Sequence, residues 1–173
     1  MIKMDVKFPI GQLEVPDTVT MEDLKSWLKD IECYTVRLNE VVDGLSEKEL
    51  EKRYRDDAWT VRELVHHIAD SQIGMFHRLK LALTDDRPNV PRFNQDEFIN
   101  LADSNMPIKP SLLILAGLNA RIVEMGERIN EDQLLRTFTL ENEKEISVAT
   151  KFAKLAWHPN HHLAHIKIAL DKK

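Results

Sequence analysis

The sequence predicts an all-α protein, a four-helix bundle with a long connection between its second and third helices. Four segments, each of about 20 residues, place apolar side chains at helical spacing. Most of these segments open at a residue that can cap a helix, and little of the chain alternates as strands do. No repeat period and no linker divides the 173 residues. We therefore expect one domain that covers residues 1–173.

The first two long helices are marked by capping boxes. Thr20 opens one box, and the apolar spacing that follows predicts a helix over residues 21 to 43. Ser46 opens a second box and predicts a short turn of helix. Thr60 opens the clearest one, so we expect the second long helix over residues 61 to 84. Its apolar face runs for about six turns, which is long enough to span a bundle.

A long connection is expected after the second helix. Four prolines lie between Asp85 and Pro110, and proline cannot continue a helix. Only a short amphipathic piece, at residues 96 to 101, interrupts this segment. A connection of this length either covers one end of the bundle as a lid or simply crosses it. Ser111 then opens the third long helix, and Asn130 ends it.

The last part of the chain is predicted to be a small hairpin followed by the fourth helix. Residues 138–140 and 145–147 flank a polar stretch, which is typical of two short strands and their turn. The fourth helix is expected over residues 148 to 171. Pro159 lies inside it and removes one backbone hydrogen bond, usually at a cost of ~3 kcal/mol. We therefore expect a kink or a restart at that position.

Composition excludes several classes of function. The net charge is −5, the isoelectric point is near 5.8, and no block of Lys and Arg is present, which argues against nucleic-acid binding. No apolar run reaches the ~18 residues of a membrane span, and no signal peptide is recognisable, so we expect a cytoplasmic protein. Cys33 is the only cysteine, which excludes an intrachain disulfide and a cysteine-based zinc site. It lies on the polar side of its helix and is interpreted as a spectator thiol.

Histidines are concentrated near the end of the chain. Four of the seven lie in the segment WHPNHHLAH. His158 and His162 are four residues apart, and so are His161 and His165. Either pair can present two imidazoles on one face of a helix, close enough to bind one ion. The spacing alone does not decide between the two pairs.

A third imidazole can come from the helix at residues 61 to 84. His66 lies on its polar side and His67 at the edge of its apolar face, so periodicity favours His67 slightly. His77 stands alone and is interpreted as a solvated side chain. Two groups of histidines on helices that share one core predict a site for a divalent metal ion.

Three blocks of sequence, in order along the chain, resemble the DinB superfamily. They are FPIG at residues 8–11, YRDDAWTVRELVHHIADS at residues 54–71, and WHPNHHLAHI at residues 157–166. The resemblance spans nearly the whole chain and is closest to the YfiT-like branch, described as metal-dependent hydrolases. It implies a DinB-like four-helix bundle, a homodimer, and one divalent ion, zinc or nickel.

The resemblance also implies which side chains bind the ion. Carried over onto this sequence, the ligands are His67, His161 and His165, and the other members of the two groups are not assigned. Three neutral imidazoles leave an open position for water, as in catalytic zinc sites. Such a site favours hydrolysis of an amide or ester bond in a small-molecule substrate.

Two other functions fit the same residues. The open position can take a thiol instead of water, which would make the protein a thiol transferase, as described for superfamily relatives that use bacillithiol or mycothiol. Alternatively, the ion is absent or structural, and the bundle is a non-catalytic stress-response module.

Four further residues near the proposed ligands are candidates for supporting roles. Asp70 either orients a ligand or acts as general base, or is a solvated carboxylate. Glu63 is more simply explained as a helix cap. Trp59 and Trp157 flank the two ligand blocks, and each either walls the site or packs in the core.

Overall fold

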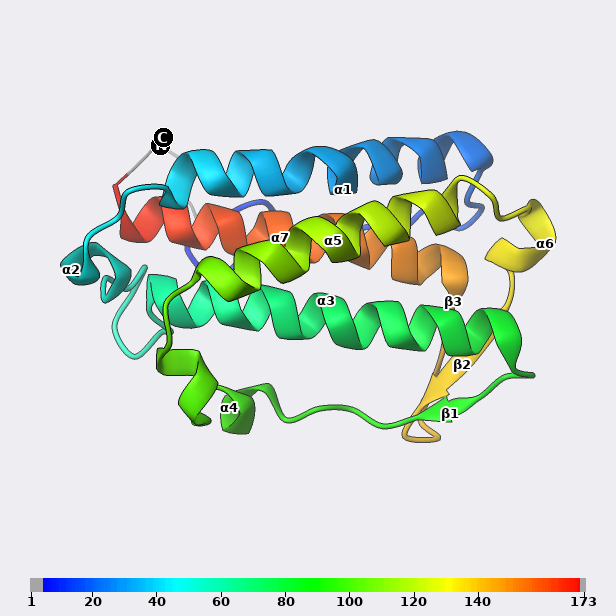
Figure 1. Cartoon of the computed structure of the whole chain (residues 1–173). Helices are drawn as coiled ribbons and strands as arrows, with labels where there is room; N and C mark the ends of the chain where they lie inside the picture. Colours follow the sequence, from blue (N-terminus) through cyan, green and yellow to red (C-terminus); the bar gives the residue numbers. More distant parts are fainter. Residues whose placement is uncertain (1–4, 172–173) are drawn as a thin grey trace.

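Four long helices form the body of the molecule (Figure 1). The structure is a computed structural model and describes residues 5–171. The four helices are α1 (Met21–Val42), α3 (Val61–Thr84), α5 (Lys109–Gly126) and α7 (Val148–Ala169). Helix α1 packs against α5 and α7, and α3 packs against the same two helices. Helices α1 and α3 therefore lie diagonally across the bundle, and α3 and α7 are neighbours.

The directions of the helices explain the long connection. In Figure 1, α3 and α5 run the same way, whereas α1 and α7 run the opposite way. Because α3 and α5 are consecutive and parallel, the chain must return along the length of α3, about 36 Å. The return segment contains β1 (Asn89–Val90), α4 (Gln95–Phe98) and the 3-10 helix η1 (Ala102–Asn105).

Capping boxes begin the helices at the predicted places. Thr20, Ser46 and Thr60 each accept a hydrogen bond from the backbone three residues later, and a side chain at that residue accepts from the cap backbone. The helix after Ser46, α2 (Glu47–Leu50), is a single turn. Local sequence determines these starts, because every group in a capping box lies within four residues.

The start and the end of α5 differ from the prediction. The helix begins at Lys109 rather than after Ser111, because Pro110 fits the first turn, where its missing N–H is not needed. It ends at Gly126. Asn130 does not end α5 but caps the next short helix, α6 (Glu131–Leu134).

A small sheet packs at one end of the bundle. The predicted hairpin is present as β2 (Thr137–Leu140) and β3 (Lys144–Ser147), which pair antiparallel. Strand β1 extends this hairpin by pairing with β2 in parallel. The sequence did not predict this third strand, because its pairing joins segments about 50 residues apart and leaves no local pattern.

A buried polar layer divides the apolar core into two clusters. One cluster includes Phe152 and the other includes Tyr34. Between them, Gln72 Nε2 donates to Asn119 Oδ1 at 3.1 Å, and Asn119 Nδ2 donates to the Ile31 carbonyl at 3.2 Å. This chain of hydrogen bonds ties α3 to α5 and α5 to α1 at one level of the bundle.

The expected restart at Pro159 does not occur, since α7 is one helix from Val148 to Ala169. Proline has no N–H to donate to the Leu155 carbonyl one turn earlier. The side chain of Gln72 supplies a donor instead, with Nε2 at 3.4 Å from that carbonyl. A neighbouring helix therefore compensates for the lost bond, and the histidines on both sides of Pro159 share one helix.

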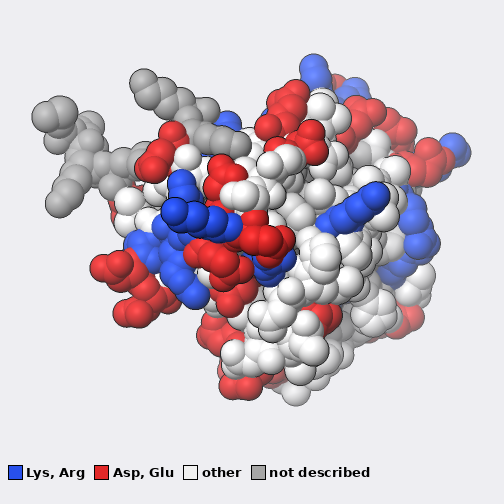
Figure 2. Space-filling view, turned by 60° about the vertical axis from the view of Figure 1, so that its left-hand side comes forward, with Lys and Arg blue, Asp and Glu red and all other residues white. Residues whose placement is uncertain are grey.

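Three further observations concern the cysteine, membrane-spanning helices and the charge on one face. Cys33 is exposed, as its position on the helix predicted. Among residues 5–171, no helix combines the length and the apolar composition that a membrane span requires. On the face shown in Figure 2, acidic and basic side chains are interspersed. That face does not present the continuous basic surface typical of a nucleic-acid binder.

Candidate metal centre

Five histidines converge where α3 and α7 pack against each other. We call them the histidine cluster, and they are His67 from α3 together with His158, His161, His162 and His165 from α7. His158 is half-buried and the other four are buried. Burial of this many imidazoles beside an apolar core is costly unless their nitrogens are satisfied.

The cluster contains two sets of three imidazoles whose nitrogens lie within 4.8 Å of one another. One set is His67, His158 and His162, and the other is His161, His162 and His165. The structure thus brings His161 and His165 together, as the predicted site requires. Neither set joins His67 to His161 and His165, because His67 lies beside His158 and His162, which the resemblance leaves outside the ligand set.

The nitrogens of the first set lie close together. His158 Nε2 is 3.3 Å from His67 Nε2 and 3.1 Å from His162 Nε2. A ring nitrogen of a neutral imidazole has either one proton or one lone pair, so His158 Nε2 cannot pair ideally with both neighbours. Three converging ring nitrogens are an arrangement in which a metal cation can replace a shared proton.

Contacts around His165 determine which of its nitrogens can bind an ion. Its Nε2 lies 3.1 Å from the carbonyl oxygen of Val6. A carbonyl only accepts hydrogen bonds, so Nε2 carries the proton and Nδ1 keeps a lone pair. Nδ1 faces the cluster, 3.3 Å from His162 Nδ1. The ring of Tyr54 stacks on His165 with centroids 4.0 Å apart, which fixes the orientation of the imidazole.

His161 has a free nitrogen within the same cluster. Like Nδ1 of His158, its Nδ1 is buried without a hydrogen-bond partner among residues 5–171. A buried polar atom left unpaired costs about 1–3 kcal/mol, so a ligand at this atom would relieve a real penalty. The ring of Trp157 stacks on that of His161 with centroids 4.5 Å apart, and the ring centroids of Trp59 and His67 are also 4.5 Å apart. Both tryptophans therefore wall the cluster.

Burial keeps the imidazoles neutral. It lowers the pKa of His67 and of His165 to about 4. Burial also lowers the pKa of His158 and His162 well below the ordinary histidine value, and the neighbouring imidazoles lower it further. At neutral pH these rings are unprotonated, which is the form that binds a metal ion.

Two histidines lie outside the cluster. His66 Nδ1 is 2.8 Å from Ser111 Oγ, and its Nε2 is 3.0 Å from the Met106 carbonyl oxygen. Both of its ring nitrogens are thus engaged on the side of α3 that faces α5. His77 is exposed, as its isolation in the sequence predicted.

The two acidic candidates, Glu63 and Asp70, have different surroundings. Glu63 accepts from the backbone of Thr60 at 2.7 Å, so it is a helix cap. Asp70 is half-buried and lines a groove along α3, and its pKa is raised by burial and by the nearby Asp103. The hydroxyl of Ser71 lies 3.4 Å from His67 Nε2. Our sequence reasoning missed Ser71, although it lies four residues after His67, on the same helix face.

The family follows from sequence comparison. The sequence model of the DinB superfamily matches residues 35–166 of this chain. This chain belongs to the DinB superfamily. A relative from Oceanobacillus iheyensis is 56% identical over 168 residues, which is 97% of each chain. A relative from Halalkalibacterium halodurans is 40% identical and covers 96% of this chain and 98% of its own. Both are named as metal-dependent hydrolases, an activity inferred rather than measured.

A solved structure shares the fold of this DinB protein. YfiT from Bacillus subtilis superimposes with a TM-score of 0.91 over 97% of this chain and 99% of its own, at 26% sequence identity. YfiT is described as a metal-dependent hydrolase, again by inference, with an unusual four-helix bundle topology. The parallel pair α3 and α5 gives the present bundle an uncommon connectivity as well.

Proposed function

We propose that this DinB protein is a hydrolase that uses one divalent ion, zinc or alternatively nickel, held by His67, His161 and His165. The observation that carries the proposal is the convergence of neutral imidazoles from α3 and α7, in which contacts of 3.1 to 3.3 Å run from His67 through His158 and His162 to His165. Ligation by three neutral nitrogen ligands is typical of catalytic zinc sites, which keep an open position for substrate.

The chain's own contacts support two of these ligands directly. The Val6 carbonyl holds the proton of His165 on Nε2, which leaves Nδ1 free to bind the ion. The buried Nδ1 of His161 has no other partner among the described residues. His67 approaches the cluster from α3, and its Nε2 contacts His158. An ion held by this set would therefore join α3 to α7.

The chemistry is divided between the ion and the protein. A divalent ion held by neutral imidazoles supplies Lewis acidity, which can activate water and polarise a carbonyl at neutral pH. Tyr54 and Trp157 hold two of the imidazoles by stacking, and their rings keep bulk water from the cluster. We assign Asp70 as general base, because it lies one turn from His67 and burial raises its pKa.

Metal analysis tests the site without reference to a substrate. The protein is purified without a nickel column, and its metal content is measured for the wild type and for His161→Ala. We expect about one ion per chain in the wild type and a clear loss in the variant. His77→Ala, which removes an exposed histidine, is the matched control and should retain the ion. Less than about half an ion per chain in the wild type, or unchanged content in His161→Ala, would contradict the proposal.

A second measurement distinguishes the ligand set from its neighbours. His158→Ala should retain most of the metal, because His158 lies outside the proposed set. If His158→Ala loses the ion while His161→Ala keeps it, the set of His67, His158 and His162 is the binding site instead.

Activity assays then test hydrolysis. The metal-loaded protein is incubated with a panel of ester and amide substrates in buffer alone and in buffer with added thiol. Hydrolysis predicts product in buffer alone, and Asp70→Asn should slow it without loss of metal. Product that forms only with thiol would assign the protein to thiol transfer.

A further inference from the structure

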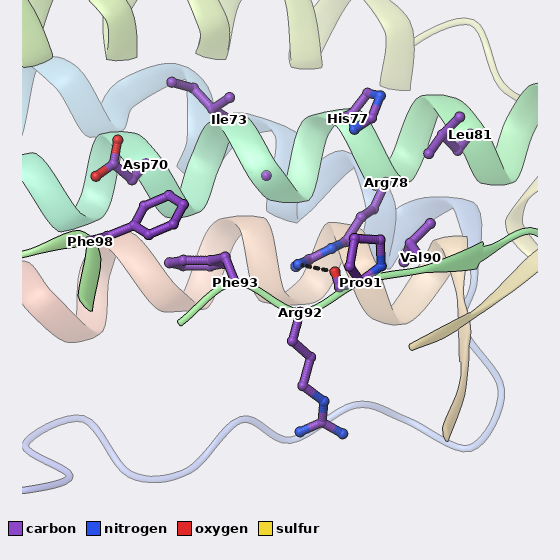
Figure 3. A pocket seen from close by; sticks show the side chains of 11 residues that line it. Asp70, Ile73, His77, Arg78, Leu81, Val90, Pro91, Arg92, Phe93 and Phe98 are labelled. Carbon is purple, nitrogen blue, oxygen red and sulfur yellow. Dashed lines mark hydrogen bonds between the residues drawn. The ribbon is translucent and has the colours of Figure 1, made fainter. Parts of the chain in front are cut away.

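A groove runs along α3, between that helix and the segment that returns from α3 to α5. Its volume is about 270 Å³. As Figure 3 shows, α3 forms one wall, with Asp70 toward one end and Arg78 toward the other. The return segment forms the opposite wall, which includes Phe93 and Phe98. A groove of this size can hold a small molecule or part of one.

The groove continues the helix face that carries His67. Asp70, Gly74 and Arg78 follow His67 in α3 by three, seven and eleven residues, so all of them lie along one stripe of the helix. On the opposite wall, the ring centroid of Phe93 lies 6.5 Å from that of His67 and 6.0 Å from the guanidinium carbon of Arg78. A molecule that lies on Phe93 can therefore have one end at Arg78 and the other near the histidine cluster.

Apolar side chains make up most of the groove lining. Phe93 and Phe98 contribute adjacent rings, whose centroids are 5.0 Å apart. Phe98 and Ile73 keep 41% and 44% of their surface exposed, although both side chains are large and apolar. Removal of such surface from water favours the binding of apolar groups. The groove therefore suits an alkyl or aromatic group.

Gly74 keeps part of the groove open. It lies inside α3 and belongs to the groove lining. A Cβ at this position would meet nothing within 4 Å, so the packing of the bundle does not require a glycine there. A larger side chain at position 74 would therefore occupy space beside the groove wall without disturbing the bundle.

Arg78 supplies positive charge to the groove. Its Nη2 donates to the Pro91 carbonyl at 2.8 Å, which holds the guanidinium against the return segment. Within residues 5–171, no carboxylate oxygen lies within 4 Å of the side-chain nitrogens of Arg78. Arg92 also borders the groove, but it pairs with Glu141 and Glu143, at 3.3 and 2.7 Å. A guanidinium has five N–H groups, so Arg78 keeps donors for a ligand.

The charges of the groove orient an anionic ligand. The carboxyl group of Asp70 disfavours an anion at its end, whereas Arg78 attracts one. A single unpaired guanidinium matches a single negative charge, and its planar fork of donors fits a carboxylate. The uncharged end of such a ligand then lies toward Asp70, which we assign as general base.

We propose that this groove binds a small carboxylic acid with an alkyl or aromatic body. The carboxylate binds Arg78, and the body packs on Phe93 beside Gly74. That the bound molecule is the substrate rests on the proposed hydrolase function, and its scissile bond then lies at the Asp70 end. That the groove binds such an acid does not depend on the metal ion.

Calorimetric titration of the full-length protein tests the groove by itself. A chelator is present, so that a carboxylate cannot bind an ion at the histidine cluster instead. The probes are 4-phenylbutanoate, the neutral 4-phenylbutanamide of nearly the same shape, and acetate. We expect 4-phenylbutanoate to bind at least about tenfold more tightly than either of the others, because only this probe has both the charge and the apolar body.

A substitution that fills the groove locates the apolar body. Gly74→Leu should weaken 4-phenylbutanoate binding by about tenfold or more, because the added side chain competes for the same space. The variant should fold, since leucine is more favourable than glycine inside a helix. Gly117→Leu in α5 is the matched control, because a Cβ there also meets nothing within 4 Å and Gly117 lies outside the groove lining.

A second variant locates the carboxylate. Arg78→Met should lower the affinity for 4-phenylbutanoate to that for 4-phenylbutanamide, because the charge that distinguishes the two probes is gone. The ratio of the two affinities is the measured quantity, so a general loosening of the groove does not imitate this result. Arg121→Met is the control, since Arg121 also lies over an aromatic ring, that of Phe76 at 5.3 Å, but outside the groove lining.

Three results would overturn the proposal. They are equal affinities of the wild type for the acid and its amide, equal binding by Gly74→Leu and Gly117→Leu, and an unchanged preference for the acid in Arg78→Met. The first two comparisons remain valid if Arg78→Met does not fold. Because a chelator is present, loss of the metal hypothesis would leave a positive result intact. Conversely, failure of the groove would leave the metal analysis unchanged.

Discussion

The buried imidazole of His67 should make the metal-free protein sensitive to acid. His67 is 2% exposed, and burial lowers its pKa from 6.5 to about 4. In the unfolded chain the same side chain takes up a proton near pH 6.5. Between these two values protons bind the unfolded chain more readily than the folded one. The contribution to stability is therefore complete above about pH 6.5 and is lost as the pH falls toward about 4.

The size of the effect follows from the two pKa values. At pH 5, almost every unfolded chain carries the proton on His67, whereas about one folded chain in ten does. Linkage then gives a loss of about 2 kcal/mol in the free energy of unfolding relative to pH 7.5. Urea denaturation at both pH values, in the presence of a chelator, measures this loss. Wild type is compared with His67→Gln, which keeps a polar side chain but cannot titrate.

The expected result is that the two proteins lose different amounts of stability when the pH is lowered. From pH 7.5 to pH 5, the wild type should lose about 2 kcal/mol more than His67→Gln, since the other histidines are present in both. His77→Gln, which removes an exposed imidazole, should follow the wild type. If His67→Gln loses as much stability as the wild type over this range, burial does not hold His67 neutral, and our account of the cluster is wrong.

Two further predictions concern the core that supports the site. A Cβ added at Gly126 would clash with Leu28 Cδ2, so Gly126→Ala should cost about 1–3 kcal/mol in urea unfolding. Gly117→Ala, in the same helix with nothing within 4 Å, should instead stabilise by up to about 1 kcal/mol, and the opposite order would contradict the packing described. Gln72→Leu should cost about 1–3 kcal/mol, because the Leu155 carbonyl loses its donor, and an unchanged melting temperature would show that water takes that place.

Local sequence determined the helices of this protein to a large extent. The caps at Thr20, Ser46 and Thr60 were predicted correctly, because each depends on groups only three residues apart. The hairpin of β2 and β3 was predicted for a similar reason. The additional pairing of β1 with β2 was not, since it depends on how the return segment crosses the bundle.

The composition of the metal centre was only partly determined by sequence. Histidine spacing placed four imidazoles on α7, but the pair of His158 and His162 and the pair of His161 and His165 have the same spacing. The rotation of α7 about its own axis decides which imidazoles meet His67. That rotation is set by packing against α3 and α1 and by the bond from Gln72 across Pro159.

The sequence by itself determined where the helices begin and that histidines gather on two of them, because caps and periodicity are local properties. Only the tertiary structure decided that His67 and His158, 91 positions apart, bring their Nε2 atoms within 3.3 Å of each other. Antiparallel packing of α3 and α7 brings them together, and no short-range pattern records such a contact. The chemistry of the site depends on that long-range arrangement.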